Sequence, residues 1–163
     1  MINETHKKLT LKEKFDFSLK YSLIYASLIS LIFAIARIAG FYTVIELRFI
    51  NYVILFPIGY LGVRAAFNSN KGFINYFNGM MISFLIGFLG QIWFMLIFLT
   101  YLLFDSSVYA FLIEQLPQPI LYPHLSLAFI MISEGLGASA ILALTMMQIF
   151  KTRHKDLLSV EQE

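Results

Sequence analysis

The chain has 163 residues, of which 59% are hydrophobic and 13% are charged, and its formal net charge is +2. Soluble domains usually contain about 25% charged residues, so this composition excludes an ordinary soluble fold and predicts an integral membrane protein. The small net charge gives no reason to expect a nucleic-acid partner. The absence of cysteine excludes disulfides and thiolate chemistry.

Four apolar stretches are long enough to cross a bilayer, which takes about 20 helical residues. They comprise residues 17–41, 49–67, 73–104 and 125–150, and a long connection of residues 105–123 precedes the last one. The stretches are continuously apolar rather than alternating, which favours helices over a β-barrel. We therefore predict one all-α membrane domain over residues 1–163, a four-helix bundle.

Lys and Arg gather on one side of the predicted spans. They lie in the N-terminal segment, in the connection between the second and third spans, and in the C-terminal tail: Lys7, Lys8, Lys12, Lys14, Lys20, Arg64, Lys71, Lys151, Arg153 and Lys155. The opposite side has Arg48 alone, and Arg37 lies within the first span. The positive-inside rule then places both termini in the cytoplasm, in agreement with an even number of spans.

Local signals refine these spans. Thr10 and Glu13 have the spacing of a capping box, so the first helix is expected to start there and run directly into the membrane. Pro57 is expected to kink the second span. Residues 106–116 can form a short amphipathic helix with Val108 and Leu112 on its apolar side. We interpret it as a helix on the outer surface, and a lid over a cavity is the alternative.

Small residues recur at four-residue steps along three of the spans, and in lipid such residues allow close helix contact. The third span has Gly79, Ser83 and Gly87, and the fourth has Gly137 four residues after Ser133 and Ser139 four residues after Gly135. The first span has a similar series, Ser22, Ala26, Ser30 and Ala34. Each series predicts either an internal seam of the bundle or a face that meets another subunit.

Four polar side chains, one from each span, are predicted to lie at a similar depth in the outer half of the membrane. At about 1.5 Å per residue, Glu134, Gln91, Asn51 and Arg37 lie about 24–30 Å from the cytoplasmic ends of their spans. A lone ionised group in hydrocarbon is costly, so Glu134 is the expected counter-ion of Arg37. The set is either a polar clasp that fixes helix register or a ligand site, or else Glu134 contacts a partner protein.

Catalysis is disfavoured, because the histidines lie at or outside the membrane boundary, at His6, His124 and His154. They offer no intramembrane haem ligands and no base beside a serine, and no cluster has metal-ligand spacing. We therefore expect no catalytic residues, no cofactor and no metal.

Residues 59–105, "GYLGVRAAFNSNKGFINYFNGMMISFLIGFLGQIWFMLIFLTYLLFD", carry a resemblance to a known family. An apolar span ends in Gly-Val-Arg, a polar turn closes on Lys71-Gly72, and Phe-Ile-x-Tyr-Phe then leads into a span with spaced Gly and Ser. The pattern resembles small bacterial four-span proteins of the domain-of-unknown-function 4199 family. That resemblance implies a bacterial cytoplasmic (inner) membrane protein without an assigned activity, and it assigns no functional residue.

The sequence favours a non-enzymatic accessory or scaffold subunit of a larger membrane assembly. Its expected partners are the lipid bilayer and other membrane subunits or a second copy of the chain. The alternative is a small transporter or ligand-binding membrane protein that uses Glu134 in a polar cavity of the outer leaflet.

Overall fold

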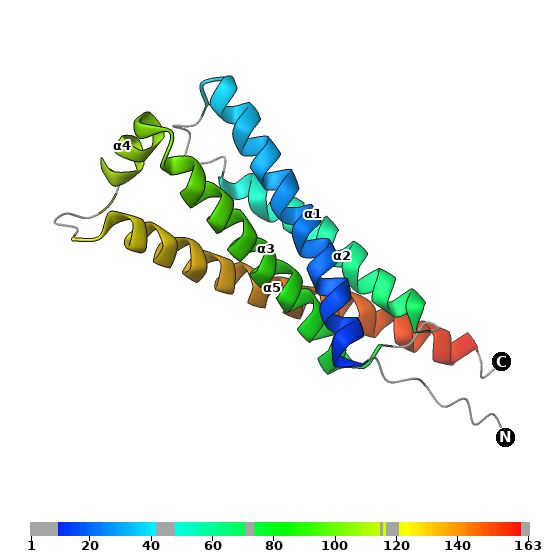
Figure 1. Cartoon of the computed structure of the whole chain (residues 1–163). Coiled ribbons are helices and arrows are strands. Elements are labelled where there is room, and N and C mark those ends of the chain that lie inside the picture. The colour runs from blue at the N-terminus through cyan, green and yellow to red at the C-terminus, as the bar shows by residue number, and fades with distance from the viewer. Residues whose placement is uncertain (1–9, 42–47, 71–73, 115, 117–120, 161–163) are drawn as a thin grey trace.

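The computed structural model describes residues 10–41, 48–70, 74–114, 116 and 121–160, with the backbone alone for residues 48 and 151–160. Within these ranges every regular element is helical: α1 Leu11–Ile38, α2 Arg48–Ser69, α3 Tyr76–Leu102, α4 Ser106–Glu114 and α5 Pro123–Val160 (Figure 1). Four of the described helices, α1, α2, α3 and α5, are long and apolar enough to cross a membrane. The predicted all-α, four-span class is therefore confirmed, and the chain is a multi-pass membrane protein.

The ends of the long helices follow local chemistry. The predicted capping box is present at the start of α1, where the Thr10 side chain accepts from the backbone N–H of Glu13 and the Glu13 carboxylate accepts from that of Thr10. The α1 helix stops before Gly40, whose φ of 81° suits a residue without a Cβ. Pro123 opens α5, where its missing N–H costs no helical hydrogen bond.

Helix α3 is the centre of the bundle, and it packs along most of its length against α1 on one side and α5 on the other. Helix α2 covers α1 and α3 and meets α5 over a shorter stretch. The start of α1 and the end of α5 lie at the same end of the molecule, while α2 and α5 separate toward the opposite end (Figure 1). The core between them is apolar and fully enclosed, as at Leu55, Val63, Ile86, Leu142 and Met146.

Small residues bring α3 close to α5. A Cβ added at Gly87 would lie 3.1 Å from Cβ and 3.2 Å from Cα of Ser139, and one added at Gly79 would collide with the Met147 sulfur. Ser83, between them, is fully buried and donates its hydroxyl proton to the carbonyl of Gly79. This series therefore lies in an internal seam.

Gly137 does not belong to that seam, although the sequence predicted a packing role for it. An added Cβ would meet no heavy atom within 4 Å, and the residue is exposed. The reason is its angular position on α5: Gly135 and Ser139 face α3, whereas Gly137 and Ser133 lie on the outward side of the same helix.

The short helix α4 lies at the end of the bundle opposite the start of α1 and the end of α5 (Figure 1). We call this the outer end, after the predicted orientation. Its buried Val108, together with Leu116, packs against Leu102 of α3 and Leu127 of α5 in a second apolar cluster. The apolar side predicted for residues 106–116 therefore faces the other helices, and α4 joins the ends of α3 and α5.

Candidate functional site

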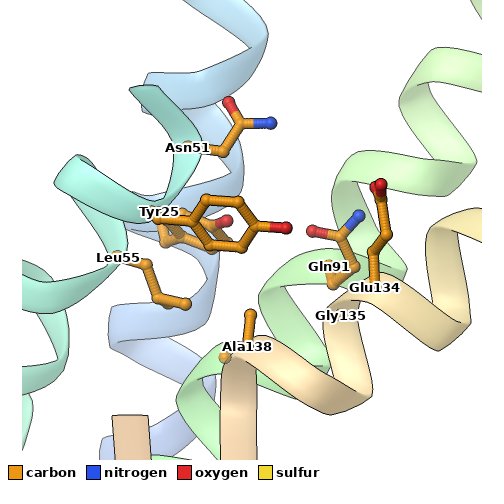
Figure 2. A pocket seen from close by; sticks show the side chains of 9 residues that line it. Tyr25, Asn51, Leu55, Gln91, Glu134, Gly135 and Ala138 are labelled. Carbon is orange, nitrogen blue, oxygen red and sulfur yellow. The ribbon is translucent and has the colours of Figure 1, made fainter. Parts of the chain in front are cut away.

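A small, open pocket lies between α2 and α5, in the half of the bundle nearer α4 (Figure 1). Side chains of α1 and α3 contribute to its inner wall, and Figure 2 shows α2 on one side and α5 on the other. Its lining residues are Tyr25, Asn51, Tyr52, Leu55, Gly87, Gln91, Glu134, Gly135 and Ala138. No residue of α4 is among them, so this helix is not a lid over the pocket.

The pocket exists because α2 and α5 touch at one level and separate beyond it. At the contact, an added Cβ on Gly59 would lie 2.8 Å from the methyl groups of Leu142. Farther outward the two helices diverge (Figure 1), and the polar residues line the space between them. At about 1.5 Å per residue, Gln91 lies about 16 Å along the axis from the outer end of α3 at Leu102. The pocket is therefore within the span rather than at its end.

Three polar side chains face this pocket without a hydrogen-bond partner in the described part of the chain. They are the hydroxyl of Tyr25 and the amides of Asn51 and Gln91. Tyr25 is only 2% exposed, and its hydroxyl points toward Gln91 in Figure 2. Glu134 lines the same pocket with an exposed side chain. Of the four polar residues predicted to form a cluster, Asn51, Gln91 and Glu134 therefore line the same pocket.

Two glycines make room for these side chains. A Cβ added at Gly135 would collide with Cγ of Gln91 and lie 2.8 Å from its Cβ, so the Gln91 side chain crosses α5 at a position without a side chain. A Cβ added at Gly90 would likewise collide with the ring of Tyr25. Sequence reasoning overlooked Tyr25, Gly90 and Gly135 as site residues. The available signal was that Tyr25 directly precedes Ala26 of the small-residue series in the first span.

Arg37 lies outside the pocket and belongs to a separate group at the outer ends of the helices. Its Nε lies 2.8 Å from Oδ2 of Asp105 and 3.2 Å from the hydroxyl of Tyr101, and its Nη2 donates to Ser107 at 3.0 Å. The prediction that Glu134 is the counter-ion of Arg37 is therefore wrong: the counter-ion is Asp105. The reason is position: Arg37 is in the last turn of α1, level with the end of α3.

Further hydrogen bonds connect the residues of this group. The Tyr101 hydroxyl also donates to Asp105, and the Asp105 carboxylate accepts from the backbone N–H groups of Ser107 and Val108 at the start of α4. The guanidinium of Arg37, followed by the hydroxyls of Ser107 and Tyr101, holds the pKa of Asp105 well below its usual range. We call Arg37, Tyr101, Asp105 and Ser107 the outer clasp, which joins α1, α3 and α4.

The chemistry available in the pocket is polar binding. Its lining provides one carboxyl group, two amides and two phenols, and it pairs no nucleophile with a histidine base. Among the described residues no three His, Asp or Glu side chains gather as a metal site would require. Comparison of the chain with family models, curated proteins and solved structures finds no match. The resemblance of residues 59–105 to the domain-of-unknown-function 4199 family stays a prediction.

Proposed function

We propose that the chain is a ligand-binding protein of the bacterial cytoplasmic membrane, of the kind that includes small transporters. It holds a small polar molecule, or the polar head of a larger one, in the pocket between α2 and α5. The supporting observation is the set of polar groups of Tyr25, Asn51 and Gln91 around Glu134, because none of the three has a hydrogen-bond partner among the described residues. Polar side chains within a membrane span usually find hydrogen-bond partners. A ligand, or water that a ligand displaces, would supply the partners.

The same observation disfavours a polar clasp made by Tyr25, Asn51 and Gln91. A clasp that fixes helix register needs direct hydrogen bonds between side chains of different spans. Such bonds are present in the outer clasp, where Arg37 bonds to Asp105 and Tyr101. In the pocket, Tyr25, Asn51 and Gln91 line an open space (Figure 2), and no hydrogen bond joins any two of them.

The test is to fill the pocket without changing its polar groups. Ala138 lines the pocket, and Ala140 lies on the exposed side of the same helix. Thermal unfolding of the detergent-purified protein is measured against a panel of small cationic, neutral and anionic compounds. We expect at least one compound to raise the melting temperature of the parent and of Ala140→Leu but not of Ala138→Leu. A ligand at 100 times its Kd adds about 2.7 kcal/mol. Stabilisation that is equal in all three proteins, or absent throughout, contradicts the proposal.

The second candidate is an accessory or scaffold subunit, and one observation favours it. Gly137 lies on an outward face of α5 with Ser133 and Ala140, and nothing within the described chain packs on it. Close helix contact in lipid uses faces of this kind. Purification in mild detergent tests the idea: a membrane protein that co-purifies with the parent and is lost with Gly137→Leu supports it, and one that is retained by the variant contradicts it.

A further inference from the structure

We infer that the pocket binds an uncharged carboxamide group, held by the Tyr25 hydroxyl and by the side-chain amides of Asn51 and Gln91. This inference rests on the proposed ligand-binding function and names the chemical class of the ligand. These three side chains line the pocket without a hydrogen-bond partner among the described residues. Glu134 and Tyr52 line it too, but each already takes part in an interaction, so neither belongs to the unpartnered set.

The Tyr25 side chain gives the pocket a buried polar group that is aimed into it. The residue is 2% exposed, and its hydroxyl points toward Gln91 in Figure 2. A buried tyrosine hydroxyl usually has a hydrogen-bond partner, and no described residue is one for Tyr25. A molecule that enters the pocket is therefore in position to supply the missing partner.

Close packing holds the Tyr25 and Gln91 side chains in these positions. A Cβ added at Gly90 would collide with the Tyr25 ring, and one added at Gly135 would collide with Cγ of Gln91. Each side chain therefore lies directly against the backbone of a neighbouring helix. Polar groups that are fixed before a ligand arrives lose little conformational freedom on binding, and this strengthens the binding.

The three unpartnered groups share one hydrogen-bonding character, because each of them both donates and accepts. The phenol has an O–H donor and an acceptor oxygen, and each amide has N–H donors and a carbonyl oxygen. An ammonium group only donates and a carboxylate only accepts, so either ion would leave half of these groups unsatisfied. A primary carboxamide carries N–H donors and a carbonyl acceptor on one small group and complements both halves. Because it is uncharged, it also costs less than either ion to transfer from water into a membrane span.

The experiment compares four probes with the same apolar chain: pentanamide, N,N-dimethylpentanamide, pentanoate and pentylammonium. Their binding to the detergent-purified full chain is measured by calorimetry, with the same detergent alone as the blank. The dimethyl compound keeps the carbonyl but lacks both N–H donors, so it tests donation, while the two ions test charge. We expect pentanamide to bind about tenfold or more tighter than each of the other probes.

Substitutions test whether the unpartnered groups are the ones that bind. Tyr25→Phe and Gln91→Met remove a polar group and keep a side chain of similar size. Each should weaken pentanamide binding about three- to tenfold, the effect of one neutral hydrogen bond. Tyr21→Phe is the matched control, because Tyr21 lies one turn before Tyr25 on α1, its ring lies beside Gly62, and it does not line the pocket. This variant should bind pentanamide as the parent does.

The outcomes separate this inference from the proposed function. If another probe binds as tightly as pentanamide and Ala138→Leu abolishes that binding, the pocket is a ligand site but not one for a carboxamide. Pentanamide binding that survives both Tyr25→Phe and Gln91→Met also overturns the inference. Should one of these two variants prove unstable, the other decides this point. If neither these probes nor the wider panel bind in a way that depends on Ala138, both proposals fail.

Discussion

Tyr25 and Tyr101 carry the same hydroxyl group in opposite situations. The hydroxyl of Tyr101 donates to Asp105 and accepts from Arg37 within the outer clasp. The hydroxyl of Tyr25 faces the pocket and has no protein partner among the described residues. At the scale of the residue, the first hydroxyl therefore contributes to stability and the second is available for binding.

Substitution by phenylalanine should separate these two roles. Tyr25→Phe removes no hydrogen bond to a described residue, so the free energy of unfolding should change by less than about 0.5 kcal/mol while ligand binding weakens. Tyr101→Phe breaks two hydrogen bonds and should lower it by about 1 kcal/mol or more. Detergent denaturation curves of the two variants measure the difference. Equal losses of stability would mean that the Tyr25 hydroxyl has a structural partner after all.

The Asp105 carboxylate predicts a dependence of stability on pH. Its folded-state pKa is lowered, chiefly by the guanidinium of Arg37. The contribution is therefore fully present above the unfolded-state pKa, about 3.9, and is lost as pH falls from there toward the folded-state pKa. We expect the melting temperature of the parent to fall more steeply between pH 4 and pH 2 than that of Asp105→Asn, which has no carboxylate to protonate. Parallel curves would show that Asp105 contributes nothing in this range.

At the scale of the element, α5 presents two different small-residue faces. Gly135 and Ser139 lie against α3, where an added Cβ on the facing Gly87 would approach the Ser139 backbone. Gly137 lies on the exposed side of the same helix. A helix that looks uniformly small and apolar in sequence therefore has one face for internal packing and another, at Gly137, that meets none of the described residues.

Leucine at Gly87 and at Gly137 should have opposite effects. Gly87→Leu overpacks the contact between α3 and α5 and should cost about 1–3 kcal/mol. Gly137→Leu meets no neighbour, and leucine is the better helix former, so stability should be unchanged or rise by up to about 1 kcal/mol. Thermal unfolding in detergent measures both. A large loss for Gly137→Leu in the isolated protein would contradict the assignment of that face.

At the scale of the whole molecule, the four spanning helices are close at one end and open between α2 and α5 at the other (Figure 1). The outer clasp and α4 join α1, α3 and α5 at the open end, and none of the described α2 side chains belongs to either group. The pocket lies on the α2 side of this end.

Membrane orientation is the prediction that belongs to this scale. The chain contains no cysteine, so single cysteines can be introduced at Ser69, at the end of α2, and at Ser106, at the start of α4. Both residues are exposed. In intact cells an impermeant thiol reagent should label the cysteine at residue 106 and leave the one at residue 69 unlabelled, because the positive residues lie on the Ser69 side. The reverse pattern would invert the orientation.

Much of the fold could be predicted from the sequence because the interactions that determine it are between residues close together in the chain. A run of about 20 apolar residues must form a helix in lipid, where each backbone polar group needs a partner within its own segment. The number of spans, the capping box at Thr10 and the apolar side of α4 all depend on neighbouring residues, and the structure contains each of them. Because the rise per residue of a helix is constant, the number of residues from the end of each span also predicted that Asn51, Gln91 and Glu134 lie at the same depth.

Rotation about the helix axes and the angles between helices were not determined by these local terms. Whether Gly137 faces a neighbour, and whether Arg37 meets Glu134 or Asp105, depends on which sides of the helices come together. The separation of α2 from α5, which forms the pocket, arises from the contact at Gly59 and Leu142 and from the divergence beyond it. The sequence by itself determined that Asn51, Gln91 and Glu134 share a depth, although it placed Arg37 there as well. Only the tertiary structure decided that they surround a space, because packing sets direction and distance across the bundle while sequence periodicity sets position along each helix.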